Sequence, residues 1–200
     1  MSIVKLNNRA VKDATAVGSI TGLGNLVFIS RSTASSSASL SITSGIDSTY
    51  KEYIFYFNNI HPQTNDTSFM VNFSTDGGSN YNVTKTTTAV QAYHGEDAGG
   101  GVLTYATGID LAQGTGDQYT IAQIGNGNDE SGSGIFHLFD PSNTTFVKHF
   151  IARGTRLGNA YASDYLIAGY GNTTSAIDAV RFNMSSGNID SGTIDMYGVK

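Results

Sequence analysis

Hydrophobic and polar residues alternate along most of the chain from residue 27 onward, which is the pattern of β-strands with one buried face. Ala38, Leu40 and Ile42 alternate strictly with serine and threonine, so this stretch predicts a strand with its other face in water. The run 53–57 reads YIFYF and is apolar at every position, which is typical of a central strand covered on both faces.

The same pattern predicts about ten strands in total and no amphipathic helix. The further runs that favour a strand cover residues 27–29, 69–73, 84–92, 119–124, 135–139, 146–151, 165–168, 177–184 and 194–199. Only two prolines occur, so we expect glycine, asparagine, aspartate and serine to form the turns. The predicted fold is all-β: an antiparallel β-sandwich, jelly-roll-like because the strands are many and some connections are long. An immunoglobulin-like sandwich is the alternative, but its Cys, Trp, Cys framework is absent.

Residues 1–26 show neither helical nor alternating spacing, and three glycines between positions 18 and 24 interrupt any helix. We expect an extended N-terminal arm over residues 1–26 and a β-sandwich domain over residues 27–200, with a frayed terminus as the alternative to the arm. Polar residues at 7–9 break the apolar stretch that a secretory signal needs, so none is predicted. No run of about 18 apolar residues occurs, so we expect no membrane insertion.

Gly, Ser, Thr and Asn fill 84 of the 200 positions, a composition that disordered segments share. Eleven Tyr and ten Phe nevertheless supply the large buried side chains that a core requires, so one folded domain is expected. The absence of cysteine excludes disulfides and thiolate zinc sites, and it fits synthesis in a reducing compartment. The chain has a net charge of −5, with a weakly basic leader followed by an acidic body. An acidic body offers no basic surface to a phosphate backbone, so we expect no nucleic-acid partner.

Two glycine-rich segments, 95–101 and 125–134, are predicted to be loops rather than strands, at exposed ends of the sandwich where partner contacts are usually made. The second segment carries four Asn, Asp and Glu side chains in residues 126–130 that could meet a calcium ion. An EF-hand needs Gly at its sixth position and Glu at its twelfth, where this chain has Ser131 and His137. We therefore predict no metal and no cofactor.

Residues 73–81, FSTDGGSNY, match an Asp-box hairpin, in which the aspartate caps a tight turn and glycine takes a positive φ. A sialidase repeats this box around a propeller, so a single copy in 200 residues predicts a structural turn instead. The chain has no Gly-x-Ser-x-Gly elbow and no glycine-rich phosphate loop. We therefore predict no enzymatic activity and no catalytic residues.

Two histidines, His137 and His149, flank the expected turn 140–145. If this hairpin closes symmetrically on a loop of two or four residues, their side chains point to opposite faces of the sheet. A shift of the register by one residue would bring them to the same face. We expect them to lie apart, in the core or at an interface.

Aromatic side chains in or beside the expected loops are candidates for stacking on a glycan or contacting another receptor. These candidates are Tyr93, His94, Tyr105, Tyr119 and Tyr161. Packing within the core is the alternative for each tyrosine.

Five long segments resemble one protein family. They read TASSSASLSITSGIDSTYKEYIFYFNNIHP (33–62), STDGGSNY (74–81), GIFHLFDPSNTTFVKHF (134–150), AGYGNTTSAIDAVRF (168–182) and MSSGNIDSGTIDMYGVK (184–200). They resemble virion structural proteins of marine and cyanobacterial tailed phages, and the resemblance covers nearly the whole chain. The opening SIVKLNNRAVKDATAVGSI is similar to a leader found in that family. The resemblance carries over no catalytic residue.

The resemblance implies a non-enzymatic virion surface protein made in the host cytoplasm, and we expect a capsid decoration or cement protein. In this hypothesis the arm binds the major capsid protein or a tail protein through Lys5, Leu6, Arg9, Val11 and Lys12, and the sandwich projects outward. A homotrimer is expected because virion appendages occupy threefold or sixfold positions. A tail fibre or receptor-binding protein is the first alternative, and a cellular carbohydrate-binding module, which would need an export signal, is the second.

Overall fold

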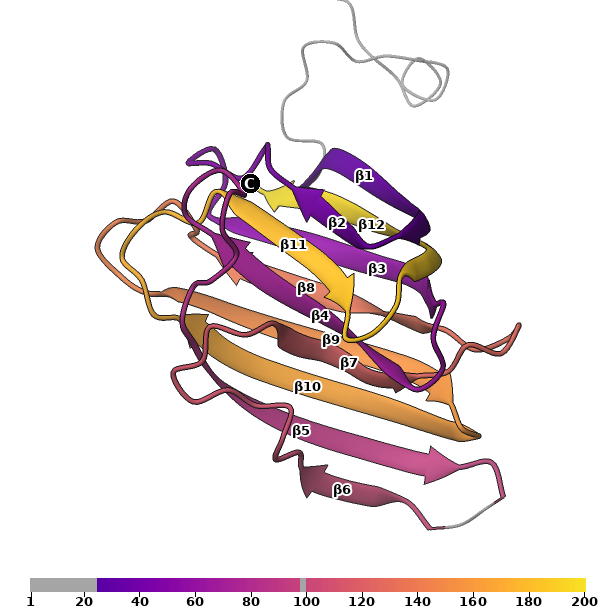
Figure 1. The fold of residues 1–200 in the computed structure, drawn as a ribbon. Coiled ribbons are helices and arrows are strands. Elements are labelled where there is room, and N and C mark those ends of the chain that lie inside the picture. Colours follow the sequence, from indigo (N-terminus) through magenta and orange to yellow (C-terminus); the bar gives the residue numbers. More distant parts are fainter. Residues whose placement is uncertain (1–24, 98–99) are drawn as a thin grey trace, which may run out of the picture.

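Two antiparallel β-sheets stack face to face in the structure, a computed structural model that describes residues 25–97 and 100–200 (Figure 1). Within these residues the chain forms twelve strands and no helix. The strands are β1 (Leu26–Ser37), β2 (Ser39–Ile42), β3 (Glu52–Pro62), β4 (Thr67–Ser74), β5 (Lys85–Gly95), β6 (Val102–Tyr105), β7 (Gln118–Ile124), β8 (Gly132–Phe139), β9 (Lys148–Gly158), β10 (Tyr161–Gly171), β11 (Ala179–Met184) and β12 (Ile189–Val199). The predicted all-β sandwich is confirmed.

The two sheets differ in width. The larger has eight strands in the order β1-β12-β3-β8-β9-β10-β5-β6, and the smaller has four in the order β2-β11-β4-β7. As a result β5 and β6 extend beyond the edge of the smaller sheet (Figure 1). No helix in the described part of the chain has the length and hydropathy that crossing a bilayer requires.

Successive strands repeatedly change sheet. The chain crosses between sheets from β1 to β2, from β2 to β3 and from β3 to β4. If the β5–β6 and β9–β10 hairpins are set aside, the remaining eight strands form two sheets of four, in the orders β1-β12-β3-β8 and β2-β11-β4-β7. The jelly-roll subclass stays a prediction at this point. The expected arm, residues 1–26, lies outside the described residues except at its last two positions, and β1 begins at Leu26.

A layer of phenylalanine rings holds the sheets together. Phe182 on β11 lies at its centre, with its ring 5.6 Å from that of Phe55, 5.2 Å from Phe57 and 6.3 Å from Phe136 on the larger sheet. It also stacks on Phe69 of its own sheet at 5.6 Å. All five side chains are fully buried, and edge-to-face contacts of this kind add stability beyond the area buried.

Glycines let β7 approach the larger sheet closely. Segment 125–134 was predicted to be loop throughout, and this is wrong at its end because β8 begins at Gly132. Gly134 pairs with Gly154 of β9, and a Cβ at Gly154 would overlap the side chain of Ile121 on β7. The glycines that suggested a loop therefore make room for tight packing between the sheets.

Several strands are longer than predicted, and one was missed. Strand β6 did not stand out because it has four residues between glycine-rich flanks. Strands β9 and β10 extend to a two-residue turn at Asn159 and Ala160, whose φ values of +53° and +60° fit a type I′ hairpin. Polar residues on the outward face of these strands hid their full length from the hydrophobic pattern.

The two hairpin histidines share a face, contrary to the prediction. Leu138 pairs with Phe150 and His137 pairs with Ile151, so His137 and His149 both lie on the outer face of the larger sheet. The register differs by one residue from that of a symmetric short hairpin, because the β8–β9 connection is a longer loop. His137 Nδ1 lies 2.5 Å from a carboxylate oxygen of Glu52.

The Asp-box segment forms the expected structural turn. The Asp76 carboxylate accepts hydrogen bonds from the side-chain amide of Asn80 at 2.7 Å, from its backbone N–H at 2.8 Å and from the Ser74 hydroxyl at 2.7 Å. These bonds lower the pKa of Asp76 to about 2, with those from Asn80 contributing most. Gly78 takes a φ of +86°, as the motif requires.

Removing the central ring should unfold the sandwich more readily than removing an exposed one. Phe182→Ala is expected to lower the free energy of unfolding by about 3–5 kcal/mol, because it leaves a cavity between four rings. Phe146→Ala is the matched control, since that side chain is 68% exposed, and should cost less than about 0.5 kcal/mol. Denaturant titration measures both, and equal losses would contradict the central role of Phe182.

A buried lysine gives the fold a distinctive alkaline behaviour. Lys85 is fully buried and donates hydrogen bonds to Asn72 Oδ1 at 2.6 Å and to the carbonyl of Val83 at 2.7 Å. Burial lowers the pKa of Lys85 to about 8, against the attraction of Asp117. The unfolded chain holds the lysine proton more tightly, so folding releases a proton between pH 8 and pH 10.5.

Stability should therefore rise with pH across that window, by at most roughly 3 kcal/mol from this lysine. Lys85→Met removes the titrating group. The unfolding free energy of the wild type minus that of this variant should therefore increase as the pH rises from 8 to 10.5. Urea titrations at a series of pH values measure it. Parallel pH profiles for the two proteins would refute the assignment.

Candidate ligand-binding site

The structure brings two of the five aromatic candidates together. Tyr93 on β5 and Tyr161 on β10 meet edge to face, with ring centroids 5.8 Å apart and an interplanar angle of 82°. Both rings are partly exposed, so this pair offers an aromatic surface to solvent.

The other three candidates lie elsewhere. His94 follows Tyr93 and therefore lies on the opposite face of β5, with Nδ1 2.8 Å from the carbonyl oxygen of Gly95. Tyr105 on β6 donates a hydrogen bond to Asp110 at 2.8 Å, and Tyr119 belongs to β7 and packs against the core. The proposed arm contacts Lys5, Leu6, Arg9, Val11 and Lys12 lie outside the described residues.

A groove of about 460 Å³ surrounds the tyrosine pair, and we call it the tyrosine groove. It lies between the end of β7 and the part of the larger sheet that extends past it. Its lining residues are Gln91, Tyr93, Thr104, Gln123, Arg156, Asn159 and Tyr161.

The strand register explains why these side chains converge. On β9 the inward positions run from Phe150 and Ala152 in the core, through Gly154, to Arg156 at the groove. Ser163 of β10 pairs with Arg156 on one side and with Tyr93 of β5 on the other. A row of inward side chains therefore crosses β9, β10 and β5 at the groove.

The β9–β10 turn places two more residues at the groove. Asn159 and Ala160 both adopt left-handed φ values, which asparagine tolerates and which cost alanine about 1 kcal/mol. Tyr161 is the next residue and begins β10, so the tight turn keeps Asn159 and Tyr161 close in space.

The electrostatics of the groove are set by one buried cation. Arg156 is only 7% exposed and is the single charged residue among those that line the groove. Within the described residues its guanidinium makes one hydrogen bond, from Nη1 to the carbonyl of Gly158, and Nε has no partner. Glu130 is engaged elsewhere, since it accepts from the backbone N–H of Gly127 at 2.7 Å and of Asn159 at 3.1 Å.

A second buried polar atom lies in the same row. Ser163 is 3% exposed, and its hydroxyl has no hydrogen-bond partner within the described chain. Buried polar groups are normally satisfied, so the unsatisfied Nε of Arg156, a residue that lines the groove, makes the groove a candidate binding site. Aromatic rings, side-chain amides and a guanidinium suit a saccharide, whose ring stacks on tyrosine and whose hydroxyls need planar polar partners.

No such convergence points to a metal. In residues 25–97 and 100–200 no three His, Asp or Glu side chains form a group that could hold a metal ion. Of the oxygen ligands considered in the β7–β8 loop, the Glu130 carboxylate caps its own loop through Gly127.

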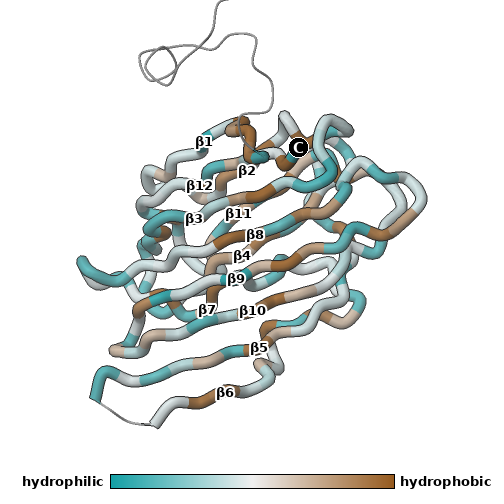
Figure 2. Tube along the Cα trace, turned by 180° about the vertical axis from the view of Figure 1, so that it is seen from behind, coloured by the Kyte–Doolittle hydropathy of each residue, from teal (hydrophilic) through white to brown (hydrophobic). Residues whose placement is uncertain are grey.

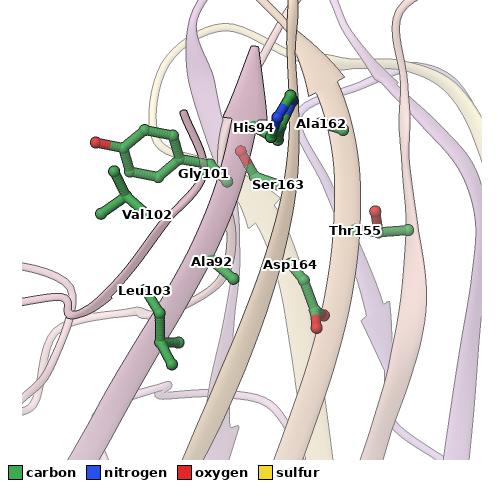
Figure 3. A pocket seen from close by; sticks show the side chains of 10 residues that line it. Ala92, His94, Gly101, Val102, Leu103, Thr155, Ala162, Ser163 and Asp164 are labelled. Carbon is green, nitrogen blue, oxygen red and sulfur yellow. The ribbon is translucent and has the colours of Figure 1, made fainter. Parts of the chain in front are cut away.

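The outer face of the larger sheet, turned away from the smaller sheet, carries a second, shallower hollow of about 470 Å³ (Figure 3). Leu103, Ala92, Asp164 and Thr155 form one register row across it, from β6, β5, β10 and β9. This hollow is a dip in an open sheet surface, and apolar atoms make most of its lining.

Exposed apolar side chains continue from that hollow along the outer face of the same strands, and we call them the outer patch. Its members are Val90, Leu103, Tyr105, Ile151 and Leu166. Leu103 is the most exposed at 75%, and Figure 2 shows the hydrophobic segment that β6 contributes to this open face. Exposed apolar clusters of this kind mark contacts with other proteins.

Comparison of the sequence with protein-family models and with curated proteins, and of the structure with solved structures, finds no match.

Sequence reasoning missed most of the polar lining of the tyrosine groove. Arg156 lies beyond the predicted end of its strand, and Gln91, Thr104, Gln123 and Asn159 carry no motif. One signal was present: continuing the alternation of Phe150 and Ala152 along β9 puts Arg156 at an inward position, where a cation is unusual.

An unpaired buried cation should lower the stability of the free protein. Arg156→Met keeps an unbranched side chain and removes the charge, so we expect the unfolding free energy to rise by about 1 kcal/mol. Arg153→Met on the outer face is the control, because Arg153 is exposed and pairs with Asp164 at 2.9 Å. That variant should change stability by less than about 1 kcal/mol, in the destabilising direction. A clear loss of stability in Arg156→Met would identify a structural arginine instead.

Proposed function

We propose that this chain is a non-enzymatic virion surface protein of a tailed phage whose β-sandwich binds a host-surface saccharide, the role of a tail fibre or receptor-binding protein. The observation that carries the proposal is the tyrosine groove: a pair of partly exposed tyrosines, side-chain amides and a buried arginine converge in one hollow. The resemblance to virion proteins of marine and cyanobacterial tailed phages supports the virion role.

The topology supports the same proposal. We infer that the eight strands left after removal of the β5–β6 and β9–β10 hairpins are a jelly roll, an architecture that serves both capsid and lectin domains. The two additional hairpins supply all of the groove lining except Gln123 of β7. The insertions into the sandwich are therefore what builds the binding site.

The N-terminal arm and the oligomeric state concern assembly into the particle. We propose that the arm, with Lys5, Leu6, Arg9, Val11 and Lys12, docks on an acidic or apolar site of a capsid or tail protein. A homotrimer would present three grooves side by side, and multivalency would turn weak single-site binding into firm attachment. A cysteine-free chain needs no oxidative folding in the host cytoplasm.

Capsid decoration is the second candidate, and the outer patch favours it. Val90, Leu103 and Leu166 would suit contact with a neighbouring shell protein. The two roles differ in copy number, since a cement protein occupies every lattice position and a fibre protein is present in few copies. Quantitative mass spectrometry of purified particles against the major shell protein separates them.

Loss of one ring of the tyrosine pair should weaken saccharide binding without unfolding the protein. Tyr161→Ala is expected to weaken binding to the oligosaccharides that the wild type retains on a glycan array by about 30-fold, the loss typical of a central aromatic contact. Tyr105→Ala on the outer face is the matched control and should bind as the wild type does. Wild-type binding to no saccharide, or equal binding by all three proteins, would contradict the proposal.

A further inference from the structure

We propose that Arg156 recognises an anionic substituent, a carboxylate or a sulfate, so that the ligand of the tyrosine groove is an acidic saccharide. This inference rests on the proposed function, which requires only that the groove bind a saccharide. It adds the chemical class of the ligand and names the residue that selects it.

Comparison with the other arginines of the described chain shows what Arg156 lacks. Arg31 lies 2.6 Å from Asp195, Arg153 lies 2.9 Å from Asp164 and Arg181 lies 3.1 Å from Asp117. Those three pairs are partly or largely exposed on the arginine side, yet each has a carboxylate. Arg156 is the most buried of the four and has no ion pair within the described residues.

A buried guanidinium without a counter-charge is costly, and a ligand oxyanion would remove that cost. The guanidinium presents a planar fork of donors that matches carboxylate and sulfate oxygens. Nε of Arg156 and the hydroxyl of Ser163 are both buried and unsatisfied, and the two residues pair directly across β9 and β10. Of the two residues, Arg156 is the one that lines the groove, so its guanidinium is the donor group that an oxyanion there would meet.

The surroundings favour a saccharide over an acidic peptide. The Tyr93 and Tyr161 rings expose an aromatic surface beside the cation, and the amides of Gln91, Gln123 and Asn159 can both donate to and accept from sugar hydroxyls. No lining residue is acidic, although the whole protein has a net charge of −5. Arg156 is thus the one formal charge in the lining, with the Glu130 carboxylate next to it along the turn through its bond to the Asn159 backbone N–H. An anion in the groove would be attracted by Arg156 and not by the net charge of the protein.

The test compares acidic saccharides with neutral partners of the same shape. Isothermal titration calorimetry on the full chain would use trigalacturonate against its methyl ester, and a sulfated galactan oligosaccharide against its unsulfated form. We expect at least one acidic form to bind about tenfold or more tightly than its neutral partner, as a charge-assisted hydrogen bond predicts. The preferred pair also distinguishes carboxylate from sulfate.

Variants assign the preference to one residue. Arg156→Met should reduce the acidic-to-neutral affinity ratio to about one, with the larger loss of affinity for the acidic form, whereas Arg156→Lys should retain part of the ratio. Arg153→Met removes the same charge from the outer face and should leave the ratio unchanged. Thermal unfolding of each variant confirms that it is folded.

Each contrary outcome has a distinct meaning. If saccharides bind but the ratio survives in Arg156→Met, or the wild type shows no acidic preference, the role of Arg156 is refuted while the proposed function stands. If none of the four saccharides binds and the glycan array is also negative, the proposed function falls as well. If a glutamate-rich peptide binds through Arg156 more tightly than every saccharide, the ligand class is wrong.

Discussion

Everything in this molecule depends on the phenylalanine layer between the two sheets. Phe182 of the smaller sheet inserts among Phe55, Phe57 and Phe136 of the larger one and fixes how the sheets face each other. Because side chains alternate along a strand, fixing the inward face in the core fixes it along the whole strand. The register that buries the phenylalanines is therefore also the register that turns Arg156 inward at the far end of β9.

The groove arises because the two sheets have unequal widths. The β5–β6 hairpin continues the larger sheet past the last strand of the smaller one, so part of the inward face has no sheet opposite it. In the core this face carries apolar side chains, whereas beyond β7 it carries Tyr93, Gln91 and Arg156. The change from an apolar core to an open polar groove thus follows from where β7 ends. Under the proposed function, the buried arginine lowers stability there in exchange for ligand recognition.

Strands with a strong hydrophobic pattern were predictable from sequence, as at 53–57 and 69–73, because burial of one or both faces leaves a direct mark on composition. Strand β6 and the outer half of β9 were not, since short length, glycine and polar outward residues erase that mark. The candidate site was likewise predictable only in part. Tyr93 and Tyr161 could be named as aromatic candidates, but their contact depends on a pairing of β5 with β10 that no local pattern encodes.

The proposed function and the proposed role of Arg156 both require that an acidic sugar binds in the tyrosine groove. A crystal structure of the protein with an acidic oligosaccharide such as trigalacturonate tests this most directly. We expect an anionic oxygen about 3 Å from the guanidinium of Arg156 and a sugar ring against Tyr93 or Tyr161. A ligand bound on the outer patch, or in the groove with its anionic groups directed away from Arg156, would contradict this expectation.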